Sequence, residues 1–268
     1  MDLGEKFIVG TSGYSFRDWV GTFYPPATRA KDMLAFYIRH FHTVEINFTF
    51  YRMPSVSTLE AMARQTPPEF TFWVKAHQQF THEHELGAAK EFLDAIGPMQ
   101  ALGQLAGVLL QYPQSFHRTV ANRRALQGAL EAFASVPAAV EFRHGSWDHP
   151  ATFEGLRKRA VTLVVPDVPN IGSLFRPKAM LTSRTGYLRL HSRASAQWYV
   201  GAAERYDYSY RDEELKGLAA DWSNLSDKAD RIFVFFNNCR HGQAAKNARR
   251  FMEIVCMGPA NLAPPSCP

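Results

Sequence analysis

Residues 140–147 read Val-Glu-Phe-Arg-His-Gly-Ser-Trp, and this stretch decides the predicted fold. Alternate residues of a strand point to opposite faces, so Val140 and Phe142 share one face while Glu141 and Arg143 share the other. A carboxylate and a guanidinium on one side of a short buried strand cost free energy unless they pair or serve a function. The stretch therefore predicts an apolar strand that ends in a polar pair.

Similar polar pairs, two residues apart, end three other apolar runs. These pairs are Glu45 with Asn47, Lys75 with His77, and Arg189 with His191. A single pair of this kind is readily explained as a structural ion pair. Its repetition at the downstream end of several strand-like runs favours one shared polar site.

Strand-like and helix-like segments alternate along the whole chain about eight times. The predicted strands are residues 7–10, 43–47, 70–77, 105–111, 138–143, 161–167, 186–191 and 231–237. The predicted helices are residues 28–41, 57–64, 87–102, 118–134, 152–159, 211–225 and 243–255. This alternation is typical of a single-domain α/β protein, a TIM-type (β/α)₈ barrel.

The predicted barrel is a single domain over residues 1–257, followed by a Pro-rich, disordered tail over residues 258–268. Residues 170–184 lack a clean helical period, so we expect irregularity around the sixth and seventh units. An open doubly wound sheet is the main alternative. Residues 10–13 are not a GxGxxG turn, however, and no phosphate-loop lysine follows them.

Composition limits the classes of protein to which the chain could belong. The 268 residues carry a net charge of +5 and are 46% hydrophobic, without an apolar stretch near the ~20 residues of a membrane span. Three scattered cysteines predict neither a disulfide framework nor a zinc site. We expect a cytoplasmic protein outside the membrane. The sequence pI of about 9.1 suits anionic ligands or nucleic acid, and also an ordinary, mildly basic enzyme surface.

The active site of such a barrel lies at the C-terminal ends of its strands. The polar residues predicted there are Thr11, Ser12, Glu45, Asn47, Lys75, His77, Gln111, Glu141, Arg143, Asp167, Arg189, His191, Asn237 and Asn238. Some of them could instead neutralise one another inside the barrel, as Glu141 with Arg189 or Glu45 with Lys75 would.

The residue types suggest roles at this site. The candidate catalytic residues are Glu45, Glu141, His191 and Lys75, since carboxylates and histidine transfer protons and the lysine adds a cation. The candidate substrate-binding residues are Thr11, Ser12, Tyr14, Asn47, Gln111, Arg143, Asp167, Arg189, Trp198, Tyr199, Asn237 and Asn238. Lys75, Arg143 and Arg189 together would hold a phosphate or carboxylate. The loop aromatics could stack on a ligand or form a small second core.

The sequence requires no cofactor. Glu45, Glu141, Asp167, His77 and His191 could supply ligands for a divalent metal, but three cations in the same ring oppose a multi-metal cluster. We therefore predict no metal site, with a catalytic metal as the alternative. Residues 82–85, His-Glu-His-Glu, also look rich in ligands, but their position favours a solvated loop.

At these same residues the chain resembles the YecE-like family of uncharacterised proteins, domain of unknown function 72. The resemblance covers nearly the whole chain and rests on Gly-Thr-Ser-Gly-Tyr at residues 10–14, Val-Glu-Ile-Asn at 44–47, Val-Glu-Phe-Arg at 140–143, Gly-Tyr-Leu-Arg-Leu-His at 186–191 and Phe-Asn-Asn at 236–238. It implies a TIM barrel and assigns no activity. The family pattern has a glycine where this chain has Ser192.

The leading hypothesis from the sequence is an enzyme that acts on a small phosphorylated or carboxylated substrate by acid/base chemistry. The reaction class stays open among hydrolysis, isomerisation and lyase chemistry. One alternative is a barrel that binds nucleic acid or processes phosphodiesters with a metal. Another is a barrel that binds a ligand without turning it over. The oligomeric state is left open.

Overall fold

The computed structural model describes residues 3–257, which form one barrel of eight parallel strands. The strands are β1 (Phe7–Thr11), β2 (Thr43–Ile46), β3 (Thr71–Lys75), β4 (Leu105–Gln111), β5 (Ala138–Glu141), β6 (Thr162–Asp167), β7 (Thr185–Leu190) and β8 (Arg231–Phe236). Their hydrogen-bonded order is β1-β8-β7-β6-β5-β4-β3-β2. The predicted (β/α)₈ fold is confirmed, and each predicted strand is present. The predicted tail, residues 258–268, lies outside the described residues.

The barrel closes between β1 and β2 through a few specific contacts. A parallel bridge joins Ser12 to Glu45. The hydroxyl of Tyr37 accepts a hydrogen bond from the N–H of Thr11 at 3.0 Å and lies 3.1 Å from the Thr43 carbonyl, to which it can donate. A Cβ on Gly10 would lie 2.3 Å from that carbonyl oxygen, so only glycine permits this close approach. The N-terminal strand thereby brings its polar end beside that of β2.

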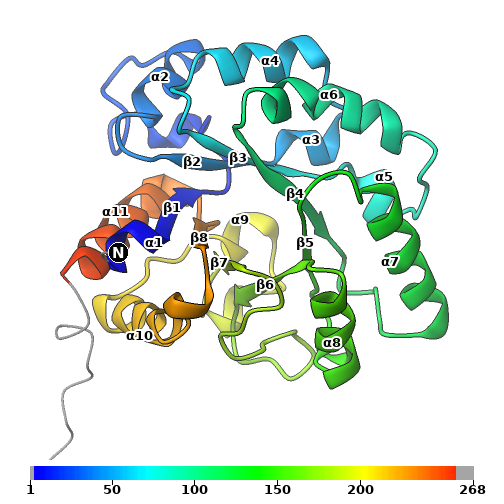
Figure 1. Cartoon of the computed structure of the whole chain (residues 1–268). Coiled ribbons are helices and arrows are strands. Elements are labelled where there is room, and N and C mark those ends of the chain that lie inside the picture. Colours follow the sequence, from blue (N-terminus) through cyan, green and yellow to red (C-terminus); the bar gives the residue numbers. More distant parts are fainter. Residues whose placement is uncertain (1–2, 258–268) are drawn as a thin grey trace, which may run out of the picture.

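Helices surround the strands, as Figure 1 shows. The α-helices are α1 (Leu3–Lys6), α2 (Met33–Tyr37), α3 (Phe48–Tyr51), α4 (Val56–Arg64), α5 (Gln78–Thr81), α6 (Ala89–Ala101), α7 (Val120–Ala132), α8 (Pro150–Lys158), α9 (Ala202–Arg205), α10 (Asp212–Ser223) and α11 (Gln243–Cys256). Between β6 and β7, residues 168–184 form no helix, which is the irregularity that Gly172 and Pro177 predict. The helix expected over residues 28–41 shrinks to α2 and a preceding 3₁₀ turn.

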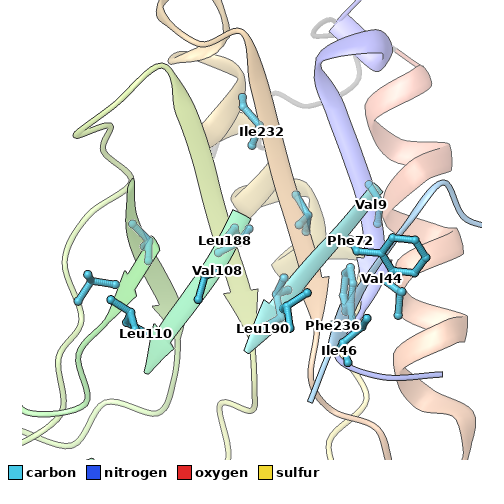
Figure 2. Packing of buried hydrophobic residues seen from close by; sticks show 14 of the residues in the cluster. Val9, Val44, Ile46, Phe72, Val108, Leu110, Leu188, Leu190, Ile232 and Phe236 are labelled. Carbon is cyan, nitrogen blue, oxygen red and sulfur yellow. The ribbon is translucent and has the colours of Figure 1, made fainter. Parts of the chain in front are cut away.

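Side chains alternate between the two faces of each strand. One set packs between the strands and the helices; members of it are shown in Figure 2, among them Val9, Val44, Phe72, Leu188 and Phe236. The other set fills the barrel interior with the buried side chains of Trp73, Leu109, Ala139, Val164, Tyr187, Phe233 and Phe235. The residues that follow this apolar set toward the C-terminal strand ends are the polar ones. No helix among residues 3–257 is long and apolar enough to cross a membrane.

Candidate functional site

Arg189 joins three strands at the polar end of the barrel. Its Nη2 donates to Oε1 of Glu45 at 2.6 Å and its Nε to Oε2 at 3.0 Å, while its Nη1 donates to Oε2 of Glu141 at 2.8 Å. These residues come from β7, β2 and β5. Arg189 is 2% exposed and both carboxylates are completely buried. The i, i+2 spacing on each strand directs all three inward, where the guanidinium lies between the two carboxylates.

The Glu45 carboxylate has two further partners. The Tyr187 hydroxyl donates to Oε2, and Asn47 Nδ2 donates to Oε1 at 2.9 Å. Tyr187 is not among the site residues that the sequence predicts. Its signal is its position two residues before Arg189 on the same strand face. Glu45 is therefore held from three directions by side chains inside the barrel.

The other oxygen of Glu141 lies between Arg143 and His191. Oε1 is 2.6 Å from Nε of Arg143 and 3.4 Å from Nε2 of His191. Asn237 Nδ2 lies 2.9 Å from Nδ1 of His191 and donates to it. An amide N–H on Nδ1 leaves the proton of a neutral imidazole on Nε2, which faces Glu141. His191 is thus a buried neutral ring that is hydrogen-bonded through Nδ1 and lies near Glu141 through Nε2.

The charges of the buried strand-end residues balance one another. Burial raises the pKa of Glu45, but Arg189 outweighs it and the pKa lies below its usual value. Burial likewise opposes ionisation of Glu141, yet Arg143 and Arg189 hold its pKa well below the usual range. Burial, and then Arg143, lower the pKa of His191 to about 3. Two carboxylates thus face two guanidiniums, and the histidine is neutral near pH 7.

Lys75 is an additional cation beside this balanced group. It ends β3, is 8% exposed, and its Nζ lies 3.8 Å from the centroid of the Phe50 ring. Within residues 3–257, its Nζ forms no ion pair and no hydrogen bond. Burial, and then Arg189, lower the pKa of Lys75 to about 7, against a partial opposing effect of Glu141 and Glu45. The amine therefore titrates near neutral pH.

A pocket of about 290 Å³ opens over these strand ends. Lys75, Gln111 and Arg143 line its floor, and the loop around α9 contributes Trp198, Tyr199, Arg205 and Tyr206. Phe50, Tyr51, His82, Pro113 and Gln114 complete the lining. The lining thus has two guanidiniums, the amine of Lys75 and several aromatic rings, and it includes no carboxylate.

The cations of the pocket keep donors free. Arg205 donates through Nε to the Trp198 carbonyl at 2.8 Å, and its guanidinium lies 5.1 Å from the Trp198 ring. Among the described residues, neither the Nη atoms of Arg205 nor those of Arg143 have a hydrogen-bond partner. Arg205 was not among the sequence candidates, because an arginine in a long loop carries no distinguishing pattern.

Three of the predicted site residues point away from the barrel interior. Thr11, Asp167 and Asn238 share their strand face with Val9, Val165 and Phe236, which pack against the helices. Thr11 Oγ1 donates to the Gly13 carbonyl, Asp167 pairs with Arg193 and accepts from Tyr210, and Asn238 donates to Asn247. The structure therefore does not bring these three to the pocket.

The remaining candidates lie in several environments. Gln111, Trp198 and Tyr199 line the pocket, with Tyr199 60% exposed and Trp198 buried. Ser12 is buried at the barrel seam, and its hydroxyl has no hydrogen-bond partner in the part of the chain that the structure describes. Tyr14 lies in the first loop, where its ring packs in a tilted arrangement against the ring of Tyr37, and it does not line the pocket.

Two further expectations concern loops. Ser192, where the family pattern has glycine, is completely buried and accepts a hydrogen bond from the Ala194 N–H at 3.1 Å. Its backbone lies outside the left-handed region, so this loop does not need glycine there. Residues 82–85 are exposed, as expected, although His82 also lines the pocket. Although His82 is exposed, partial desolvation of its imidazole at the pocket lowers its pKa to about 4, and Lys75 adds to the effect.

A larger groove of about 990 Å³ lies away from the strand ends, near α10 and α11. Arg250 lines this groove and pairs with Asp212 and Glu253, so the charge of its guanidinium is neutralised within the protein. The lining of the groove includes none of the inward-pointing residues at the strand ends. Across residues 3–257, no three His, Cys, Asp or Glu side chains converge as a metal-holding group.

Comparisons with known proteins agree with this architecture. The sequence profile of a family described as "Protein of unknown function DUF72" matches residues 8–267. The "UPF0759 protein YunF" of Bacillus subtilis (strain 168) is 29% identical, over 96% of this chain and 97% of that protein. A crystal structure of a DUF72 family protein from Thermotoga maritima MSB8 has a TM-score of 0.87 at 38% identity, covering 93% of this chain and 98% of that one. Another, from Enterococcus faecalis V583, has a TM-score of 0.83 at 23% identity, covering 98% and 100%.

Proposed function

This chain belongs to the DUF72 family, whose description assigns no activity, and we propose from its site that it is an enzyme acting on a small anionic molecule. The observation that carries the proposal is the pocket at the barrel mouth, which presents Lys75, Arg143 and Arg205 without a lining carboxylate. Free guanidinium donors bind phosphate or carboxylate oxygens in pairs. The site lies where TIM barrels carry their active sites.

Lys75 is the reacting group in this proposal. Of the four candidate catalytic residues, it is the one that lines the pocket, whereas Glu45, Glu141 and His191 are completely buried. A general acid or base is most effective when its pKa lies near the working pH, and the pKa of Lys75 is about 7. Glu45 and Glu141 act as positioning residues, since they hold Arg189 and Arg143 in place.

The aromatic lining suggests the rest of the substrate. Phe50, Trp198, Tyr199 and Tyr206 surround the cations, and stacked rings bind the apolar faces of sugars, bases and other flat groups. A volume of about 290 Å³ suits a small molecule better than a polymer. Nucleic-acid binding stays a separate prediction, which a gel-shift titration at several salt concentrations tests.

The proposal is tested by a thermal-shift screen of phosphorylated and carboxylated metabolites, followed by product detection by NMR. A ligand at 100 times its Kd should stabilise the protein by about 2.7 kcal/mol. We expect Arg205→Met to weaken every anionic hit and Lys75→Met to abolish turnover while binding persists. Lys90→Met, which removes an exposed lysine paired with Asp94, is the matched control. If uncharged analogues bind as well as the anions, the proposal is wrong.

A further inference from the structure

The environment of the Lys75 amine differs from that of the lysines that form ion pairs in this structure. Lys90 and Lys158 are exposed and lie 2.6 and 2.8 Å from carboxylates on their own helices. Lys75 is 8% exposed, has no such partner among residues 3–257, and has its Nζ 3.8 Å from the centre of the Phe50 ring. Its Nζ therefore has no internal acceptor and lies at the pocket floor.

Burial, and then the charge of Arg189, disfavours protonation of this amine. Glu45 from β2 and Glu141 from β5 face it, but both are engaged by Arg189 from β7, and Glu141 is also paired with Arg143. Arg189 and Arg143 are the cations that act on it, while His82, which follows α5, has a pKa of about 4 and is neutral at pH 7. With a pKa of about 7, a large fraction of this amine is neutral at pH 7, whereas an exposed lysine is almost wholly protonated.

Building on the proposed anion site, we propose that Lys75 Nζ is a nucleophile that forms a Schiff base with an aldehyde or ketone bearing a phosphate or carboxylate. Arg143 and Arg205 would hold the anionic group while the carbonyl carbon lies against Nζ. A desolvated lysine beside other cations is the environment that activates amines toward carbonyl groups. The proposal names the substrate class of the pocket and a covalent role for its lysine.

The step needs no further reactant. The nitrogen lone pair forms a C–N bond as the carbonyl π electrons move to oxygen. A proton passes from nitrogen to that oxygen, giving a carbinolamine. The hydroxyl then takes up a proton from solvent in the open pocket and leaves as water, and the nitrogen lone pair forms the C=N⁺ bond. An amine that attacked an acyl group would instead give a stable amide, whereas the carbonyl adduct hydrolyses back to the amine and is compatible with turnover.

The test uses matched probes on the whole wild-type chain. Dihydroxyacetone phosphate carries a ketone and glycerol 3-phosphate carries an alcohol in its place; pyruvate and lactate form the corresponding carboxylate pair. Each is incubated with the protein and cyanoborohydride, and the modified residue is mapped by mass spectrometry. We expect the ketones to label Lys75 at pH 7 at least about tenfold faster than Lys90, because exposed lysines are protonated there. Inorganic phosphate should slow the labelling.

Two controls separate the covalent step from binding. Lys75→Arg keeps the positive charge and should still bind glycerol 3-phosphate by calorimetry, but it should lose the trapped adduct. In the wild type the trapping rate should rise through pH 7 and then level, following the neutral amine. Trapping at Lys75 that phosphate suppresses supports the inference. Binding of the alcohols without any adduct at Lys75 overturns the Schiff base and leaves the anion site standing. Absence of binding by phosphate and both alcohols overturns the proposed function itself.

Discussion

Two sets of charged side chains share the C-terminal end of this barrel, and they differ in what neutralises them. The interior set, Glu45, Glu141 and Arg189, is completely or almost completely buried, and its guanidinium pairs with both carboxylates while the Nε of Arg143 supplies a second cation to Glu141. The pocket set consists of Lys75, Arg205 and the Nη atoms of Arg143. Within residues 3–257, the Nζ of Lys75 and the Nη atoms of both arginines have no hydrogen-bond partner. The difference shows that a buried charge is either paired or available for a ligand, and that carboxylates at a strand end need not be the reacting groups.

The largest effect should come from breaking the interior set. Arg189→Met leaves two buried carboxylates without their shared cation, which should lower the free energy of unfolding by about 3–5 kcal/mol. Urea denaturation measures it. The matched control is Arg184→Met, since Arg184 forms an exposed pair with Asp230 and should cost about 0–1 kcal/mol. Equal costs for the two variants would contradict the distinction between buried and exposed pairs.

The second expected effect is a dependence of the unfolding free energy on pH, which arises from Lys75 in the pocket set. The pKa of Lys75 is about 7 when folded and 10.5 when unfolded, so the folded protein bears a full penalty below pH 7 and none above 10.5. The stability difference between the two proteins should therefore change with pH. Relative to wild type, the unfolding free energy of Lys75→Met should be about 2–4 kcal/mol higher at pH 6 than at pH 10. Denaturation curves at both pH values measure the gap. A gap that does not change with pH would show that Lys75 is not perturbed.

A smaller effect should follow from removing one pocket cation. Arg205→Met should weaken the binding of a phosphate-bearing ligand by roughly tenfold, or about 1.4 kcal/mol, while the stability of the empty protein changes little. Isothermal titration calorimetry gives the affinity, and a melting curve checks the fold. Unchanged affinity would place the anion elsewhere in the barrel.

The smallest effect is expected outside the barrel interior. Asp167 points toward Arg193 and Tyr210, so Asp167→Asn should change the affinity for the same ligand by less than about twofold. Calorimetry under the conditions used for Arg205→Met makes the two results comparable. A large loss of affinity would contradict the assignment of Asp167 to the helix-facing side of β6.

The sequence alone could have predicted which strand face carries some of the candidate site residues. Val9, Val165 and Phe236 are apolar strand residues two positions before Thr11, Asp167 and Asn238, and alternation alone places these three on the helix-facing side. Arg205 could not be found in this way, because it lies in a loop with no period. Nor could exposure be predicted: Glu141 and Arg143 share one strand face, yet Glu141 is sealed and Arg143 lines the pocket.

The sequence by itself determined the eight strands, their parallel arrangement around helices, and the inward direction of Glu45, Lys75, Glu141 and Arg189. These follow from local periodicity, which a few neighbouring residues specify. Only the tertiary structure decided which charges neutralise one another. Arg189 and Glu45 lie 144 residues apart, and their pairing exists because closure of the barrel brings β7 and β2 around one interior. The same closure left the Lys75 amine without an ion-pair or hydrogen-bond partner among residues 3–257, and no local pattern predicts that.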